Sequence, residues 1–341
     1  MQVFPFFIPH EGCPHRCLFC QQEKTSGHKA APVPLGVADA LNRLLPPVGD
    51  GDIAFYGGSF TLLPATRQRD YLEVAARFVR AGRAGGIRIS TRPDGLENRH
   101  LDVLDGFPLR TIEIGCQSFN HEVLARSGRG HCAEAAVGAT ARVRRAGLAV
   151  GLQLMPGLPG GDRAEALSSL QKALGLRPDF LRIYPTVVLA GSALQTLFDR
   201  GQFQPLGLDE AVEICAEMLW RCRQAAVPVI RLGLQPTREL DGPAGVVAGP
   251  YHPAFGQLVC SHLWRRALLR VVEETSEQVV FVCSSELSDA LGQRRQNLEF
   301  IRTRRGDFAI SGQKDIPRGT LHVGSESFSL MELAAYEGFC H

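Results

Sequence analysis

Short apolar runs and longer amphipathic stretches alternate along the first two thirds of the chain. Seven runs rich in β-branched and aromatic residues have the length of strands, at 3–8, 52–56, 86–91, 109–116, 148–155, 180–188 and 227–232. Apolar positions with helical spacing predict helices between them, at 64–81, 99–104, 133–146, 164–174 and 209–225. Strands that alternate with helices predict βαβ units and a parallel sheet.

The number of these units separates the possible parallel folds. Six or seven βα units over residues 1–235 are too few for a full eight-unit barrel. Their regularity favours a partial (β/α)6 TIM-like barrel, and a doubly wound sheet is the main alternative. We expect the barrel to occupy residues 1–235.

The rhythm changes after residue 237. A stretch rich in Gly and Pro, RELDGPAGVVAGPYHPAFG, predicts a linker or a buttress between two parts. Beyond it we expect a helix at 258–274, a strand at 279–283, one helix over 285–304, and strands at 308–312 and 320–324. The sequence thus predicts a small C-terminal α+β appendage, which with its linker spans residues 236–341.

Five predicted strands end in Gly, Pro or small polar residues. These ends read YGGSF, STRPDG, GCQSF, LMPGLPGG and RIYPT. The carboxyl ends of parallel strands meet at one edge of the sheet, where ligands bind in such folds. The sequence therefore predicts a single binding site at the mouth of the partial barrel.

Composition adds little to this picture. The chain has 341 residues, a net charge of +2 and 45% hydrophobic residues, which is ordinary for a globular protein and does not indicate nucleic acid or membrane binding. No apolar run approaches the ~18 residues of a membrane span, and the first residues lack the features of a secretory signal. We therefore expect a cytoplasmic protein whose thiols stay reduced.

Three of the ten cysteines gather in one loop, EGCPHRCLFCQQ, directly after the first strand. Thiolates are the ligands of iron–sulfur clusters, and a cubane cluster normally takes four of them. Cys13, Cys17 and Cys20 would leave one iron open to another ligand. The alternative is a zinc site that His10 or His15 completes.

The spacing C-x-x-x-C-x-x-C, with Phe19 before the last cysteine, resembles the radical S-adenosylmethionine superfamily. This resemblance implies that Cys13, Cys17 and Cys20 bind a [4Fe-4S] cluster, and that S-adenosylmethionine chelates the fourth iron through its amino and carboxylate groups. YGGSF resembles the glycine motif that lies near the cofactor's amino group, with Ser59 in place of the common Glu.

Over roughly residues 1–235, STRPD, GCQS, MPGLPG and RIYPT further resemble the radical domain of the Elongator catalytic subunit family, which modifies the wobble uridine of tRNA. Eukaryotic-type members have a longer first cysteine gap, a basic N-terminal extension and an acetyltransferase domain. None of these is evident here, so the chain resembles a compact bacterial-type member without the acetyltransferase domain, and the acetyl-transfer half of the reaction does not carry over.

The resemblance implies a set of cofactor contacts at the strand ends: Phe19, Gly57, Gly58, Ser59, Phe60, Ser90, Arg92, Gln117, Pro156 and Gly157. Each has a structural alternative. The glycines suit a tight turn, MPGLPGG suits a stiff loop, and Arg92 could pair with Asp94 at the surface. The sequence assigns no catalytic acid or base.

A basic run, QRRQNLEFIRTRR, carries Arg294, Arg295, Arg302, Arg304 and Arg305 against the single acid Glu299. Such a run can contact an RNA backbone, or it can form a solvated helix face.

Taken together, these features predict a radical enzyme that abstracts hydrogen from a substrate in RNA, with tRNA modification as the expected outcome and a reductant protein as partner. A radical enzyme acting on a small molecule such as a tetrapyrrole, and a non-enzymatic zinc or iron–sulfur protein that binds nucleic acid, are the alternatives. The atom attacked, the electron donor and the oligomeric state are not defined by the sequence, nor is whether S-adenosylmethionine is consumed.

Overall fold

The computed structural model describes residues 2–336, which form two compact units. The first unit consists of the described residues up to 206 together with 227–251, and the second of 207–226 together with the described residues from 252 onward. The helix α9 (Leu208–Gln224) packs with α11 (Phe255–Glu274) in the second unit. The domain boundary after residue 235 stays a prediction.

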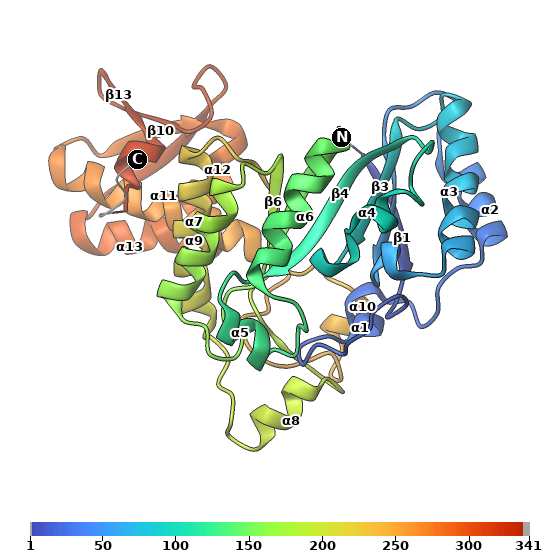
Figure 1. Cartoon of the computed structure of the whole chain (residues 1–341). Coiled ribbons are helices and arrows are strands. Elements are labelled where there is room, and N and C mark those ends of the chain that lie inside the picture. The colour runs from blue at the N-terminus through green and yellow to red at the C-terminus, as the bar shows by residue number, and fades with distance from the viewer. Residues whose placement is uncertain (1, 337–341) are drawn as a thin grey trace. The chain divides into compact units, whose positions relative to one another are not determined.

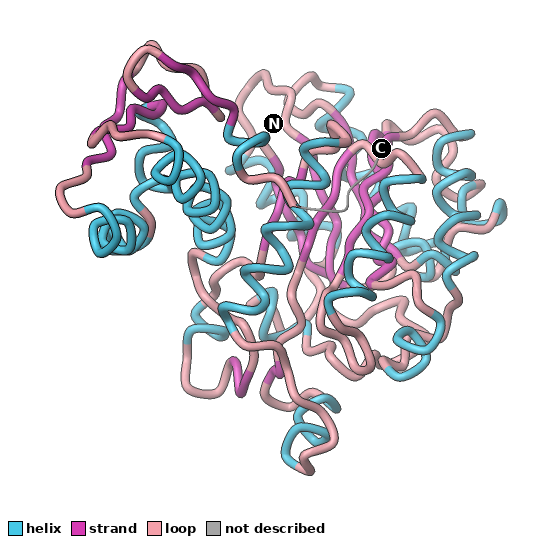
Figure 2. The backbone as a smooth tube through the Cα atoms, turned by 90° about the vertical axis from the view of Figure 1, so that its left-hand side faces the viewer, coloured by secondary structure: helices cyan, strands magenta, loops and turns pink. Residues whose placement is uncertain are grey.

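The first unit contains a seven-stranded parallel sheet in the order β1-β2-β3-β4-β5-β6-β8. Its strands are β1 (Val3–Ile8), β2 (Asp52–Gly57), β3 (Gly86–Thr91), β4 (Leu109–Gln117), β5 (Ala149–Leu154), β6 (Phe180–Ile183) and β8 (Val229–Leu232). Figure 1 shows β1, β3, β4 and β6 in succession across the sheet, and Figure 2 shows its strands running side by side. The sheet order follows the chain without reversal, so the partial TIM-like barrel is confirmed and the doubly wound alternative is wrong.

Helices connect the successive strands. They are α1 (Gln22–Ser26), α2 (Pro34–Leu44), α3 (Ala65–Arg80), α4 (Asn98–Leu101), α5 (His121–Arg126), α6 (Ala133–Arg145), α7 (Arg163–Gly175) and α8 (Ala193–Asp199). The sequence pattern did not predict α1, α2, α5 or α8, and of these α2 buries Val37 and Leu41 fully. Proline at the first position of α2 suits a helix start, since the missing amide hydrogen has no partner there in any case.

The two faces of the sheet differ in character because successive side chains of a strand point to opposite sides. Apolar side chains form one face: Ile53, Phe55, Ile87, Ile89, Ile112 and Ile114 are buried there. The helices α3, α6 and α7 contact the sheet. The opposite face carries buried charged side chains, because Arg88 and Glu113 alternate with these isoleucines along β3 and β4.

The Gly/Pro-rich segment predicted as a linker is partly structured. Its short helix α10 (Arg238–Asp241) precedes β9 (Val246–Ala248), which pairs antiparallel with β7 (Val188–Leu189). Val187, Leu189 and Leu240 form a small core between these elements. The segment thus supports the end of the first unit.

The second unit has a four-stranded sheet in the order β11-β10-β12-β13. Its strands are β10 (Val279–Cys283), β11 (Ala309–Gln313), β12 (Thr320–Val323) and β13 (Glu326–Ser329), and its other helices are α12 (Leu287–Leu291), α13 (Gln296–Arg305) and α14 (Leu330–Leu333). The single helix predicted over 285–304 is wrong. The structure has two helices there, α12 and α13. They are separated because Arg294 and Arg295 adopt left-handed backbone angles, with φ of 50° and 61°.

None of the described helices is both long enough and apolar enough to cross a membrane.

Candidate active site

The cysteine loop connects β1 to α1 and carries three reduced thiols. Cys17 is buried, and Cys13 and Cys20 are half-buried. The amide of Cys20 donates a hydrogen bond to the carbonyl oxygen of Cys17 over 3.1 Å. Burial is the main cause that raises the pKa of Cys20 to about 12, and the nearby thiols of Cys17 and Cys13 contribute to the rise. The thiols of Cys13 and Cys17 thus lie close enough to act on Cys20, and all three belong to one short loop.

The turn after β2 lies directly against this loop. The amide of Gly58 donates to the carbonyl of Ile8 over 2.8 Å, and the amide of Ser59 donates to the carbonyl of Glu11 over 3.0 Å. A Cβ atom on Gly58 would lie 2.0 Å from the Glu11 carbonyl oxygen, so only glycine fits. This close packing leaves 3.5 Å between the Oγ of the buried Ser59 and the Sγ of Cys13.

The two aromatic residues predicted at the cofactor lie in different surroundings. Phe60 is 2% exposed and stacks on Phe55, with 5.4 Å between the ring centroids. Its ring therefore belongs to the hydrophobic core of the first unit. Phe19 is half-buried within the cysteine loop itself.

Arg92 follows β3 and is buried with one hydrogen-bond donor unused. Its Nε and Nη2 each donate to a carboxylate oxygen of Asp94 over 2.9 Å. Burial acts to raise the pKa of Asp94, but the hydrogen bonds and charge of Arg92 outweigh it and hold that pKa below its ordinary value. The Nη1 of Arg92 has no hydrogen-bond partner among the residues that the structure describes. A buried donor without a partner is costly, so this atom suits an acceptor on a bound ligand.

The remaining predicted contacts also lie at strand ends. Ser90 is half-buried near the end of β3, and Gln117 ends β4 with a φ of 69°, an uncommon angle for a residue other than glycine. The side chain of Gln117 accepts a hydrogen bond from Gln153 over 3.0 Å. Pro156 and Gly157 are buried after β5. The ends of β2, β3, β4 and β5 are neighbours in the sheet, so the fold brings these positions to one edge.

Gly157 also lines a groove. The groove has a volume of about 370 Å³, and its walls are the loop after β5 and the segment 202–206, together with Arg126 and Leu197. Leu206 packs so closely on Gly157 that a Cβ atom added to this glycine would lie 2.7 Å from Leu206 Cδ1.

Sequence reasoning missed Arg129, which lies in the loop after α5. Its Nη1 donates to the Sγ of Cys17 over 3.2 Å, and its Nη2 donates to the carbonyl of Gly115 over 2.5 Å. Its Nε donates to the Nε2 of His131 over 3.1 Å. Burial lowers the pKa of His131 to about 4, and the charge of Arg129 adds to this effect. A buried cation thus contacts the middle cysteine.

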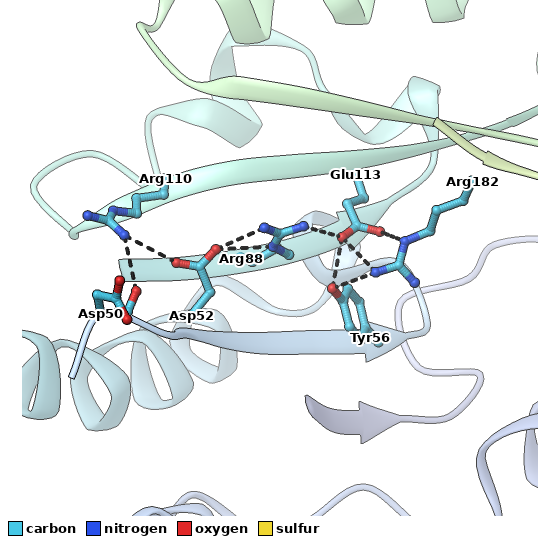
Figure 3. A network of polar contacts seen from close by, with 7 residues as sticks. All are labelled: Asp50, Asp52, Tyr56, Arg88, Arg110, Glu113 and Arg182. Atoms are coloured by element: carbon cyan, nitrogen blue, oxygen red, sulfur yellow. Dashed lines mark hydrogen bonds and ion pairs between the residues drawn. The ribbon is translucent and has the colours of Figure 1, made fainter. Parts of the chain in front are cut away.

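A second polar cluster lies on the charged face of the sheet, and its central members are Asp52, Tyr56, Arg88, Glu113 and Arg182; Figure 3 also draws Arg110 and Asp50 at one end. Arg88 bridges the carboxylates of Asp52 and Glu113 over 3.0 and 3.1 Å. The Nε of Arg182 lies 2.7 Å from Glu113 Oε2, and the hydroxyl of Tyr56 donates to Glu113 Oε1 over 2.8 Å. Burial first, and then the charge of Glu113, raise the pKa of Tyr56. We call this set the sheet network.

Three thiols on one short loop fit an iron–sulfur cluster better than the zinc alternative. Such a cluster takes thiolate ligands, and an unoccupied coordination position can accept a further ligand. The Nε2 of His10 already accepts a hydrogen bond from the amide of Gln22 over 3.1 Å, so that atom is not free to bind zinc, whereas His15 is exposed and stays open as a zinc ligand. Within residues 2–336, no three His, Cys, Asp or Glu side chains, the loop cysteines included, are arranged around a single ion position, whereas a cubane cluster takes each cysteine on a different iron.

The basic run lies on and beside α13, and three of its arginines contact their own unit. Arg305 donates to the carbonyls of Val272 and Thr275, at the end of α11. Arg302 donates to the carbonyl of Phe308 over 3.0 Å, and the Arg304 guanidinium lies 3.7 Å from the centroid of the Phe300 ring. Arg294 and Arg295 are exposed. Arg302, Arg304 and Arg305 are nevertheless exposed as well, so all the arginines of the basic run are solvated and their contact with RNA stays a prediction.

Two family models match the chain. The radical SAM superfamily model matches residues 7–173, and the radical SAM C-terminal domain model matches residues 178–265. The chain therefore belongs to the radical SAM superfamily, as its cysteine spacing indicated. The family implies a [4Fe-4S] cluster and S-adenosylmethionine.

Within the superfamily, the chain is similar to Elongator-type proteins. It is 33% identical to the tRNA uridine(34) acetyltransferase of Methanocaldococcus infernus over 136 residues, which is 39% of this chain and 25% of that protein. It is also 33% identical to Elongator complex protein 3 of Homo sapiens over 137 residues, with the same two shares. The chain thus matches about a quarter of the length of these relatives.

Among solved structures, the archaeal Elp3 of Methanocaldococcus infernus with an N-terminal deletion matches with a TM-score of 0.60 and 21% identity. The match covers 78% of this chain and 63% of that one. The similarity shows that the two chains share the fold. The site residues named above stay predictions as ligands and cofactor contacts.

Proposed function

We propose that the protein is a radical S-adenosylmethionine enzyme that holds a [4Fe-4S] cluster on Cys13, Cys17 and Cys20 and modifies RNA, with tRNA as the substrate. The observation that carries the proposal is the gathering of three thiols on one loop at the edge of a parallel half-barrel, next to Ser59 and Arg129. One iron then has no cysteine from this loop and is available to the cofactor.

The residues at the strand ends would receive the cofactor. When bound, the cluster and S-adenosylmethionine together supply a 5′-deoxyadenosyl radical that abstracts hydrogen from the substrate. The unused Nη1 of Arg92 can donate to a carboxylate, and the buried hydroxyl of Ser59 can hold a polar group beside Cys13. The glycine turn keeps the backbone free of side chains at this edge. Phe19, Ser90, Gln117, Pro156 and Gly157 complete the set that we propose around the cofactor.

Anaerobic reconstitution with iron and sulfide tests the chemistry. We expect about four irons per chain and dithionite-dependent release of 5′-deoxyadenosine from S-adenosylmethionine. Replacement of Cys13, Cys17 and Cys20 by Ala should abolish both. Cys132→Ala is the matched control, because this cysteine is exposed and lies outside the loop. One bound zinc without cofactor cleavage would contradict the proposal and favour a non-enzymatic metal protein.

The proposal of tRNA as the substrate rests on the similarity to proteins named for tRNA modification, which covers 39% of this chain. Nucleoside profiles of tRNA from cells with and without the protein test it. We expect one modified nucleoside to disappear when the gene is deleted and to return with the wild-type chain. The variant that lacks the three loop cysteines should not restore it. Identical profiles would contradict the RNA proposal while leaving radical chemistry intact.

A radical enzyme acting on a small molecule is the second candidate. One observation favours it: Arg302, Arg304 and Arg305 already use guanidinium contacts within their own unit, which restrains the side chains that would have to meet RNA phosphates. Cofactor cleavage that an added metabolite stimulates and tRNA does not would support this candidate. In either case the cluster must be reduced by one electron, so we propose a reductant protein as partner. The cytoplasmic location stays a prediction.

A further inference from the structure

Arg129 is fixed in place by three hydrogen bonds from its guanidinium, each to a different element. One goes to the thiol of Cys17 in the cysteine loop and one to the carbonyl of Gly115 in β4. The third goes to His131, two residues further along the chain. The side chain is buried, with 6% of its surface exposed. Its position is therefore defined without any bound ligand.

His131 holds the guanidinium in one orientation. A guanidinium can only donate, so the Nε2 of His131 accepts from Arg129 and the imidazole proton sits on Nδ1. That nitrogen lies 3.1 Å from the carbonyl oxygen of Cys132 and donates to it. The two loops are also joined directly, because the amide of Leu18 donates to the carbonyl of Ser127 over 3.0 Å. Arg129 and the cysteine loop thus form one rigid assembly.

A cation that donates a hydrogen bond to a ligand sulfur acts on the redox properties of a cluster. Reduction adds one negative charge, and hydrogen bonds to the sulfurs together with buried positive charge stabilise the reduced form. Burial strengthens this effect because the local dielectric constant is low. The interaction therefore raises the reduction potential and makes the cluster easier to reduce.

We infer that Arg129 is a positioning residue that holds the Cys17 thiolate and raises the reduction potential of the proposed cluster. The inference rests on the proposed function, because it requires that Cys17 is a ligand. It assigns to Arg129 a role at the cluster itself, and to His131 the role of fixing the guanidinium.

Redox titration of the reconstituted protein, followed by electron paramagnetic resonance, tests the inference. We expect a more negative midpoint potential in Arg129→Gln than in the wild type, at equal iron content. Arg129→Lys should shift the potential in the same direction by less, since an ammonium keeps the charge but cannot reproduce the planar fork. His131→Ala should also give a small negative shift. The matched control is Arg126→Gln, which removes an exposed arginine three residues away and should leave the potential unchanged.

The outcomes separate the inference from the proposed function. If the wild-type chain assembles no cluster, the proposed function fails. If it does, and Arg129→Gln has the wild-type potential, Arg129 does not tune the cluster and the inference is overturned. Should Arg129→Gln not fold or not load iron, the Lys variant decides: a shifted potential supports the inference and an unchanged potential overturns it.

Discussion

The sheet network and the strand ends near the cysteine loop both contain buried arginines. The hydrogen-bond partners of these arginines differ between the two regions. In the sheet network, Glu113 contacts Arg88, Arg182 and Tyr56, so its carboxylate is fully engaged. Beside the cysteine loop, Arg129 donates to a thiol instead of a carboxylate, and Arg92, which follows β3, keeps an unused donor. Each charged side chain of the sheet network has an oppositely charged partner within the chain, although Asp52 Oδ1 has no hydrogen-bond partner among the described residues, whereas the Nη1 of Arg92 has neither and is left for a ligand.

This difference distinguishes buried charged side chains that stabilise the fold from those that are suited to bind a ligand. Buried charges that satisfy one another hold neighbouring strands in register and leave little reason for a ligand to enter. Buried donors and thiols that lack such partners are costly for folding alone, and they suggest a binding site. Mutations in the two clusters should therefore have opposite signatures: loss of stability in the sheet network and loss of cofactor binding at the loop.

The largest loss of stability is expected for Glu113→Ala. It leaves Arg88 and Arg182 buried without their shared carboxylate, which costs about 3–5 kcal/mol in comparable buried pairs. Urea unfolding measures the loss. The control is Glu122→Ala, which breaks an exposed ion pair with Arg126 and should cost less than ~1 kcal/mol. Equal losses in the two variants would show that the sheet network does not hold the fold.

Gly58→Ala should affect both stability and the site. The added methyl group meets the Glu11 carbonyl oxygen at 2.0 Å, so the cysteine loop must move. We expect a loss of about 1–3 kcal/mol, as in other overpacked sites, and reduced iron loading on reconstitution. Gly175→Ala is the control, because its new Cβ meets no atom within 4 Å. Normal iron content in Gly58→Ala would contradict the close packing of the turn on the loop.

Asp94→Asn tests the ion pair between Asp94 and Arg92. We expect the effect of this substitution on stability to depend on pH. The folded-state pKa of Asp94 is depressed, below about 3.9 for the unfolded chain. The stability that the carboxylate contributes is therefore present above pH ~4 and is lost as the pH falls through the folded-state value. The wild type should exceed the variant by about 1–2 kcal/mol at pH 7, with a smaller difference at pH 3. A difference that does not fall with pH would contradict the ion pair.

The smallest effect on stability is expected for the double variant Arg294→Gln, Arg295→Gln. Both side chains are exposed, so we expect a change within about 0.5 kcal/mol. If these arginines bind RNA phosphates, the slope of log affinity for tRNA against log salt should fall by about 2. Arg99→Gln, in an exposed pair with Glu97, is the control for charge. An unchanged slope would favour the small-molecule candidate.

Much of the fold could be predicted from the sequence because strand and helix periodicities differ strongly in the first unit. The regular spacing of apolar runs predicted all seven strands of the large sheet. The helix α2 was missed, because its apolar stripe is short and lies close to a proline-rich loop. In the second unit, the break after Gly292 depends on the left-handed angles of Arg294 and Arg295, which helical spacing does not reveal.

The candidate site was predictable where its residues are close in sequence. The three cysteines and the glycine turn carry local patterns, and the structure brings them together through backbone hydrogen bonds. Arg129 lies 112 residues from Cys17, and no local pattern connects the two. The sheet network did leave a signal, because Arg88 is the single charge of β3 and Glu113 is the single acid of β4, each between isoleucines. Such residues indicate paired charges on the opposite face of a sheet.

The spectrum of the reduced cluster, with and without S-adenosylmethionine, tests the central claim most directly. If Cys13, Cys17 and Cys20 leave one iron open, the cofactor binds that iron. The electron paramagnetic resonance signal of the reconstituted protein should then change on its addition. A cluster that forms fully and keeps the same signal in saturating S-adenosylmethionine would contradict the account.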